Sequence, residues 1–484
     1  MNIALVAYVV GYVLCMEAAL MLIPMAVAVL TGVGDWIYFV YTVVPLALAG
    51  FFLRFQKPKV KRMTTREGLA AVAFSWIFLA AFGALPFYFS GYFNSYVDCF
   101  FETVSGFTTT GATILTDIEG LKNGGLMFWR SFTHWIGGMG ILVFVLAILP
   151  NMDASNVQLL RAESPGPTPG KVVPRLKETA RILYLIYFGL TILHILCLLA
   201  TGMPLFDSVI HSMGSAGTGG FSNMNASVGA YGNPAAEWVI AVFMMLFGVN
   251  FSLYYLLLKR QVKDVLKNEE LRLYLGVIAA AVVCMTLNIA RDYYDSSWPD
   301  AVRSAFFQVS SIITTTGYST ADFNLWPTFS KMVIVVLMIV GASAGSTGGG
   351  IKVSRLLTLV KALREEFRRL LHPRRIHAPR MDGRIIEQNV LKGILIFFAT
   401  YMMIAGTAMT LISIDGYDME STITAVLSAL GNIGPGLSAV GPMGNFAGFS
   451  VFSKLVLSFC MLAGRLELFP MLILFNPSSW KKTK

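Results

Sequence analysis

Phe107-Thr108-Thr109-Thr110-Gly111-Ala112-Thr113 is a small, polar stretch that lies between apolar segments of the chain. Three later stretches are similar to it: Ser215-Ala216-Gly217-Thr218-Gly219-Gly220-Phe221, Ile313-Thr314-Thr315-Thr316-Gly317-Tyr318-Ser319 and Asn432-Ile433-Gly434-Pro435-Gly436-Leu437-Ser438. Their central glycines recur at intervals of about 100 residues, at Gly111, Gly219, Gly317 and Gly436. This recurrence predicts four copies of one structural unit.

The composition is that of a membrane protein. Of the 484 residues, 56% are hydrophobic and 13% are charged, whereas a soluble domain has about 25% charged residues. The formal net charge of +10 would suit a nucleic-acid partner, but the basic residues gather in short loops between apolar runs, which indicates membrane orientation instead. The five cysteines form no CxxC pair or metal-ligand cluster, and no nucleophile–base pair is present. We therefore expect no enzyme activity, no cofactor and no nucleic-acid partner.

Apolar runs predict ten spanning helices and four shorter helices that enter the membrane and return. Residues 3–30 and 35–53 are two N-terminal spans, and a basic cluster follows at Lys57, Lys59, Lys61, Arg62 and Arg66. Each unit then has a long helix, a short helix, a glycine-centred turn and a second long helix. The second long helices are predicted at 126–149, 237–258, 331–359 and 453–475. The predicted boundaries are 1–66 for the two N-terminal helices and 67–160, 161–265, 266–385 and 386–484 for the four units.

Charges predict how these units lie in the membrane. Cytoplasmic loops carry an excess of Lys and Arg, so the basic loops and both chain ends are expected on the cytoplasmic side. The opposite stretches, which include Asp98, Glu102 and Asp207, are acidic. An acidic mouth concentrates cations.

The four turns suit a cation filter. Irregular backbone at membrane depth is tolerated where it lines a cavity or is buried in protein, and a ring of carbonyl oxygens can replace the hydration shell of K⁺. Glycine adopts the positive φ that such turns need. The alternative is that the glycines only allow close helix packing, which fits four turns after four short helices less well. The candidate K⁺-binding residues are Thr109, Thr110, Gly111, Gly217, Thr218, Gly219, Thr315, Thr316, Gly317, Gly434, Pro435 and Gly436.

Two further features are candidates for a gate. Residues 341–350 are glycine-rich within a predicted span, and each glycine costs a helix ~1 kcal/mol relative to alanine, so we expect a loop or a kink below the turns. Its candidate gating residues are Gly345, Ser346, Thr347, Gly348, Gly349 and Gly350. Arg465 is predicted midway along the last span, where an arginine costs at least ~2.5 kcal/mol. It is either a positive barrier in the ion path or one half of a buried ion pair.

Taken together, these residues resemble the Trk/Ktr/HKT superfamily of potassium transporters, and most closely its bacterial TrkH-type subunits. The resemblance covers essentially the whole chain and rests on residues 100–113, 135–140, 160–167, 344–352 and 463–467. It implies four M1–P–M2 units around one pore, a homodimer, a cytosolic TrkA-type nucleotide-binding ring, and a glycine-rich gate opposite Arg465. A glycine at the first filter position, Gly111, is the pattern of the K⁺-selective members.

The expected function is K⁺ uptake across the inner or plasma membrane, with K⁺ as the transported ion. A poorly selective K⁺/Na⁺ pathway, or symport with H⁺ or Na⁺, remains an alternative. A different class, an alternating-access transporter built of inverted repeats, requires oppositely oriented halves. The positions of the basic loops instead place all four units in the same orientation.

Overall fold

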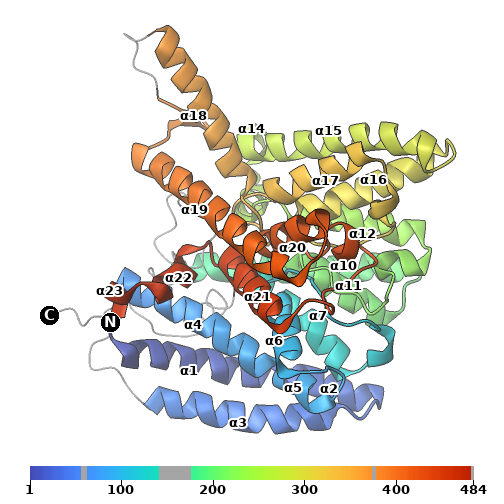
Figure 1. Ribbon diagram of the computed structural model, residues 1–484, viewed down its shortest axis with the longest axis vertical. Helices are drawn as coiled ribbons and strands as arrows, with labels where there is room; N and C mark the ends of the chain where they lie inside the picture. The colour runs from blue at the N-terminus through green and yellow to red at the C-terminus, as the bar shows by residue number, and fades with distance from the viewer. Residues whose placement is uncertain (56–62, 141–175, 373–377, 481–484) are drawn as a thin grey trace.

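The computed structural model describes residues 1–55, 63–140, 176–372 and 378–480. Within these ranges the regular structure is helical apart from one small antiparallel hairpin, β1 (Arg380–Met381) with β2 (Arg384–Ile385). Most helices lie alongside one another, α18 (Val353–Leu371) projects from the body, and the N-terminus and α23 (Pro477–Trp480) lie at the same side of the view (Figure 1). The expected all-α fold is confirmed.

Three predicted features lie outside the described residues. They are the basic residues Lys57, Lys59, Lys61 and Arg62, the second half of the predicted span 126–149, and the stretch 160–167.

The N-terminal helices pack closely against each other. α1 (Ile3–Leu20) and α2 (Leu22–Thr31) together form one apolar span of 29 residues, and α3 (Trp36–Phe55) forms another. A Cβ on Gly11 of α1 would lie only 2.9 Å from the carbonyl oxygen of Gly50 of α3. Small residues at such contacts let membrane helices approach each other. The two predicted N-terminal spans are therefore confirmed as helices.

The rest of the chain shows the same order of elements four times, and we call these groups the first to fourth units (Figure 1). The long helices are α4 (Thr65–Gly83, followed by α5, Leu85–Ser90), α10 (Leu176–Ala200), α15 (Glu269–Asp292) and α19 (Gln388–Ile412). The short helices are α6 (Tyr96–Phe107), α11 (Leu205–Gly217), α16 (Trp298–Ile313) and α20 (Met419–Gly431). The second helices are α7 (Gly125–Gly138), α12 (Pro234–Phe247), α17 (Thr328–Val340) and α21 (Val451–Arg465).

The second helices are shorter than the sequence predicts, and this is the main correction to the expected fold. They contain 14, 14, 13 and 15 residues, so at ~1.5 Å per residue none crosses a ~30 Å hydrocarbon core. Among the described residues, six helices are long and apolar enough to span a membrane, or seven if one bent pair is included. The sequence predicts ten spans, of which 126–149 lies partly outside the described residues. Each second helix thus ends before the predicted span does, and of these early ends the sequence predicts only the one after α17.

Local backbone chemistry explains two of the breaks that the sequence analysis missed. After α12 the chain turns by 90° into α13 (Phe251–Leu258), where the Asn250 side chain accepts a hydrogen bond from the Ser252 amide at 2.9 Å. α21 ends because Glu467 and Leu468 have φ of +59° and +69°, outside the helical region. The break after α12 lies within apolar sequence, and the hydropathy of the segment stays high across it.

Shorter elements complete the fold. The remaining α-helices are α14 (Val262–Lys267), α22 (Phe469–Leu472) and α23 (Pro477–Trp480). The 3₁₀ turns are η1 (Glu119–Leu121), η2 (Ser227–Tyr231), η3 (Phe323–Leu325), η4 (Ser413–Asp415), η5 (Ser438–Val440) and η6 (Ile473–Phe475).

The long helices expose apolar side chains while the turns are buried. On α10, Leu185, Phe188 and Leu196 are each more than half exposed. By contrast, Thr109 and Thr315 in the turns have no exposed surface. A large apolar outer surface marks a lipid or protein contact, so this arrangement fits a membrane protein with a polar interior.

Candidate ion filter and gate

The four turns share one backbone conformation. In each, the first residue has φ between +55° and +59°, and the residue two positions later is a glycine with positive φ. The amide between them donates to the carbonyl five residues back, as from Thr110 to Ser105 (2.9 Å) and from Thr316 to Ser311 (2.9 Å). The equivalent triplets are Thr109-Thr110-Gly111, Thr218-Gly219-Gly220, Thr315-Thr316-Gly317 and Asn432-Ile433-Gly434.

This equivalence corrects the sequence alignment of the second and fourth turns. The glycines that match Gly111 and Gly317 are Gly220 and Gly434, not Gly219 and Gly436. Gly436 lies beyond the turn, where its amide donates to Val440 at 2.6 Å. The second turn has adjacent glycines and the fourth has Gly-Pro-Gly, so the sequence offers two alignments for each and only the backbone decides between them.

The turns contact one another in a closed cycle. A Cβ on Gly111 would collide with the carbonyl oxygen of Gly219, and a Cβ on Gly434 would lie 2.8 Å from that of Thr110. The other two contacts join Gly220 to the Thr316 carbonyl and Gly317 to the Ile433 carbonyl. Because the four contacts lead back to the first turn, the turns surround a common axis.

A cavity lies on the side of the ring toward the loops that follow the turns. Its lining includes all four equivalent glycines, Gly111, Gly220, Gly317 and Gly434. Pro435 also lines it, together with residues 440–446 of the loop that follows. Gly217 instead ends α11 and packs against the carbonyl of His134. The ring is thus reached directly from one mouth of the protein.

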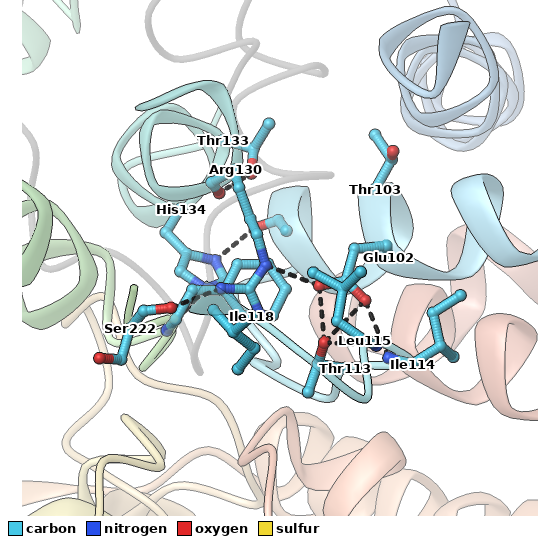
Figure 2. Close-up of polar contacts among 12 residues, drawn as sticks. Glu102, Thr103, Thr113, Ile114, Leu115, Ile118, Arg130, Thr133, His134 and Ser222 are labelled. Carbon is cyan, nitrogen blue, oxygen red and sulfur yellow. Dashed lines mark hydrogen bonds and ion pairs between the residues drawn. The ribbon is translucent and has the colours of Figure 1, made fainter. Parts of the chain in front are cut away.

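A buried ion pair joins the first turn to the second (Figure 2). The Nε of Arg130, on α7, donates to Glu102 of α6 at 2.7 Å, and both side chains are at most 1% exposed. Arg130 also donates to the Ser222 carbonyl at 2.8 Å, while Glu102 accepts from Thr113 and from the Ile114 amide. Arg130 is not among the residues predicted from the sequence, although a charge in an apolar helix, the signal that marks Arg465, marks Arg130 equally.

His134 makes a second link between the same turns (Figure 2). Its Nε2 accepts a hydrogen bond from the Phe221 amide at 3.3 Å, so its Nδ1 carries the proton and donates to the Gly106 carbonyl at 2.7 Å. The contacts of His211 run to the Asp207 carbonyl and to Ser222. Both histidines therefore hold backbone segments in place.

The glycine-rich segment after α17 is a buried loop, as predicted, and it packs on the break in the second unit. The Ser343 amide donates to the Gly248 carbonyl at 3.1 Å, and the Phe251 amide donates to the Gly345 carbonyl at 3.0 Å. The Thr347 hydroxyl donates to Phe247 at 3.2 Å. The break between α12 and α13 leaves the backbone groups of Phe247, Gly248 and Phe251 free of helical hydrogen bonds, so the loop can bind to them.

Arg465 lies at the end of α21, not midway along a span. Its guanidinium donates to the carbonyl oxygens of Thr347 in the loop (2.7 Å) and of Gly138 at the end of α7 (2.7 Å), and also to that of Gly137. Glu467, beyond the helix end, instead pairs with Arg355 of α18. Arg465 therefore connects the loop of the third unit to the first unit.

Two more residues hold the ends of the loop. Glu270, at the start of α15, accepts hydrogen bonds from the amides of Ala344 (2.6 Å) and Ser354 (3.2 Å). The ammonium group of Lys352, which is 4% exposed, donates to the Gly348 carbonyl. Together with Arg465 and the break in the second unit, these residues bind the loop to several units.

Apolar helices of spanning length around a buried ring of irregular backbone define the class, a polytopic helical membrane protein. The family model described as "TrkH: Cation transport protein" matches residues 38–482. The chain belongs to this TrkH family, and the resemblance seen in the sequence is confirmed. It is a transport family and not an enzyme family, and the described residues hold no group of three or more His, Cys, Asp or Glu that could bind a metal ion.

Individual relatives are similar over the full length. The Trk system potassium uptake protein TrkH of Salmonella typhimurium (strain LT2) is 37% identical over 487 residues, covering 100% of both chains. The Trk system potassium uptake protein TrkG of Escherichia coli K12 is 30% identical, covering 99% of each chain. The crystal structure of the potassium transporter TrkH from Vibrio parahaemolyticus has a TM-score of 0.88 and 32% identity, covering 99% of this chain and 100% of that one.

Proposed function

We propose that this protein takes up K⁺ across the cell's inner membrane, through the axis that the four turns surround. Ions enter from the acidic side, lose water at the ring of backbone carbonyls and then pass the glycine-rich loop. The membrane potential drives them, at ~2.3 kcal/mol per charge per 100 mV. The observation that carries the proposal is the closed cycle of contacts from Gly111 through the second, third and fourth turns back to Thr110.

The proposed filter consists of the four equivalent triplets. It keeps Thr109, Thr110, Gly111, Thr218, Gly219, Thr315, Thr316, Gly317 and Gly434 from the sequence prediction, and it gains Gly220, Asn432 and Ile433. Gly217, Pro435 and Gly436 become flanking residues. Carbonyl rings can replace the hydration shell of K⁺, and K⁺ uptake is the activity in the names of the relatives at up to 37% identity.

The proposed gate is the loop that includes residues 345–350, with Arg465 as its link to the first unit. Its burial and its bonds to Phe247, Gly248 and Glu270 support a closed position. The four units, with the boundaries predicted from the sequence, correspond to M1–P–M2 repeats with one orientation, and both chain ends face the cytoplasm. The contacts between the turns run in one sense around the ring, each glycine meeting the carbonyl of the next turn, which supports one orientation over oppositely oriented halves.

Further components belong to the proposal. The relatives are named as parts of a Trk system, which supports association with other proteins. We propose a homodimer regulated by a cytosolic TrkA-type nucleotide-binding ring.

Uptake of rubidium by potassium-transport-deficient cells tests the proposed function. Cells that express the protein should accumulate Rb⁺, and an excess of Na⁺ should compete weakly. Equal competition by Na⁺ and K⁺ would favour the poorly selective alternative. Absence of any Rb⁺ uptake by folded protein in the membrane would contradict the proposal.

The variant Gly111→Ser tests the filter itself. A side chain at φ +80° costs about 1–3 kcal/mol and would also meet the Gly219 carbonyl, so we expect K⁺/Na⁺ discrimination to fall about tenfold or more. The matched control is Gly406→Ser on the exposed face of α19, where a Cβ meets nothing within 4 Å. An unchanged permeability ratio in Gly111→Ser would remove this turn from the filter.

A further inference from the structure

The first and third turns are almost identical, which makes any difference between them informative. Both have the sequence Thr-Thr-Thr-Gly, and φ is +55° at Thr109 and +59° at Thr315. In each, the threonine before and the threonine after share a hydrogen bond between hydroxyls of 2.8 Å. Thr109 and Thr315 are fully buried. Their hydroxyls therefore occupy equivalent places at the inner end of the ring.

These two hydroxyls differ in what they bind. The Oγ1 of Thr315 accepts a hydrogen bond from the Gly349 amide of the loop at 2.7 Å. The Oγ1 of Thr109 is buried without a hydrogen-bond partner among the described residues. The loop thus touches the ring through one threonine of a matched pair.

Glycines in the loop allow this contact. A Cβ on Gly348 would lie 2.9 Å from the Thr314 carbonyl, and a Cβ on Gly349 would collide with the Gly431 carbonyl and lie 2.9 Å from the Cβ of Asn432. The loop therefore packs directly on the inner ends of the third and fourth turns. Hydrogen bonds with Arg465 and Glu270 attach the loop to helices α21 and α15. The hydrogen bond with Thr315 attaches it to the third turn, which is part of the proposed filter.

We propose that Thr315 couples the filter to the gate, as a positioning residue whose hydroxyl binds either the loop or an ion. The inference rests on the proposed function, because it takes the turns as the filter and the loop as the gate. The Gly349 amide directs the positive end of its dipole at Thr315 Oγ1. A cation at the inner end of the ring needs the same oxygen and is repelled by that dipole, so ion binding there weakens the docking of the loop.

Linkage makes this coupling reciprocal. If an ion at the inner end of the ring loosens the loop, then release of the loop strengthens ion binding at that end by the same factor. A filter without an ion keeps the loop docked and the path closed. The gate would then respond to K⁺ at the filter as well as to any cytosolic component.

The test measures exposure of the loop with and without K⁺. The probe is Ser346→Cys, in the full-length protein with Cys15, Cys99, Cys197, Cys284 and Cys460 replaced, and the readout is its rate of reaction with a thiol reagent in membranes. We expect this rate to rise at least about threefold when K⁺ replaces a large organic cation, because loss of one hydrogen bond is worth about that much. A rate that does not depend on K⁺ would overturn the proposal.

Substitutions then assign the effect to the hydroxyl. Thr315→Val should react at the faster rate with or without K⁺, and Thr315→Ser, which keeps the hydroxyl, should restore the dependence on K⁺. Thr109→Val, the matched change in the first turn, should shift the K⁺ concentration needed but keep the dependence. If Thr315→Val fails to fold, Thr315→Ala removes the same oxygen. Normal dependence on K⁺ in a folded variant without this hydroxyl would contradict the coupling.

Rb⁺ uptake in the same membranes separates the two proposals. If the protein carries Rb⁺ but labelling of Ser346→Cys ignores K⁺, the coupling is wrong and the proposed function stands. If the protein without substitutions carries no Rb⁺, the proposed function fails.

Discussion

Two arginines of the second helices, the buried Arg130 on α7 and the half-buried Arg465 on α21, have different surroundings. Arg130 contacts the Glu102 carboxylate and lies with its guanidinium 3.6 Å from the centre of the Phe221 ring. Arg465 reaches backbone carbonyls of the loop and of the end of α7. Removing Arg130 leaves the buried Glu102 carboxylate without its counter-charge. Removing Arg465 leaves only neutral backbone carbonyl groups without a donor. We infer that Arg130 keeps the filter assembled and that Arg465 keeps the loop docked.

The largest expected effect comes from Arg130→Ala. Breaking a buried ion pair by removing one partner typically costs about 3–5 kcal/mol, so the melting temperature of the purified protein should fall sharply, and little folded protein should remain. The double variant Glu102→Gln with Arg130→Met should recover part of the loss, because no unpaired charge remains buried. If Arg130→Ala melts like the unsubstituted protein, the comparison between the two arginines fails.

Arg465→Ala should have a smaller effect on stability and a visible effect on transport. Hydrogen bonds from a charged group are worth about 1.5–3 kcal/mol, and the loop that loses them should spend more time undocked. We expect faster basal Rb⁺ uptake per folded protein, measured against the amount in the membrane. A loss of folded protein without faster uptake would mean that Arg465 only supports the fold.

Glu270→Gln tests a second contact of the loop and should have a smaller effect on transport than Arg465→Ala. It replaces a carboxylate that accepts from Ala344 and Ser354 by a neutral amide, so the loop should be weakened by about 1 kcal/mol, and basal uptake should rise less than in Arg465→Ala. Glu269→Gln is the control, since its carboxylate pairs with Lys361 on a partly exposed surface. Equal uptake by the two variants would show that Glu270 does not hold the gate.

The sequence predicts the elements of this fold well where composition and local structure agree. The four short helices, each before a glycine-centred turn, are predicted from the sequence, and α6, which ends at Phe107 directly before the first turn, is one example. Glycine content also predicts the loop after α17. By contrast, the break at Gly248–Asn250 has one glycine in apolar sequence, and the contact that requires this glycine is tertiary: a Cβ on Gly248 would lie 2.5 Å from the Tyr274 hydroxyl.

The candidate filter likewise has turns that the sequence alone identifies and turns that it does not. The Thr-Thr-Thr-Gly turns are recognised directly, because one glycine has one possible place. In the second and fourth turns, a threonine and an asparagine adopt positive φ at Thr218 and Asn432. Thr218 adopts the same conformation as Thr109 and Thr315, and asparagine, which is enriched there, replaces threonine in the fourth turn; only the surrounding ring shows that these residues fill equivalent positions. The partner of Arg130 is 28 residues away, a distance that no local pattern encodes.

The closed cycle of turns has a direction. Each equivalent glycine faces the carbonyl of the turn that follows it in the chain, and Gly434 faces the first turn. A bulkier residue in one turn therefore pushes on its successor and leaves its predecessor untouched. The displacement caused by a substitution is therefore passed in one direction around the ring. The effects of two substitutions in consecutive turns should be non-additive, whereas those of the same two substitutions in opposite turns should be additive.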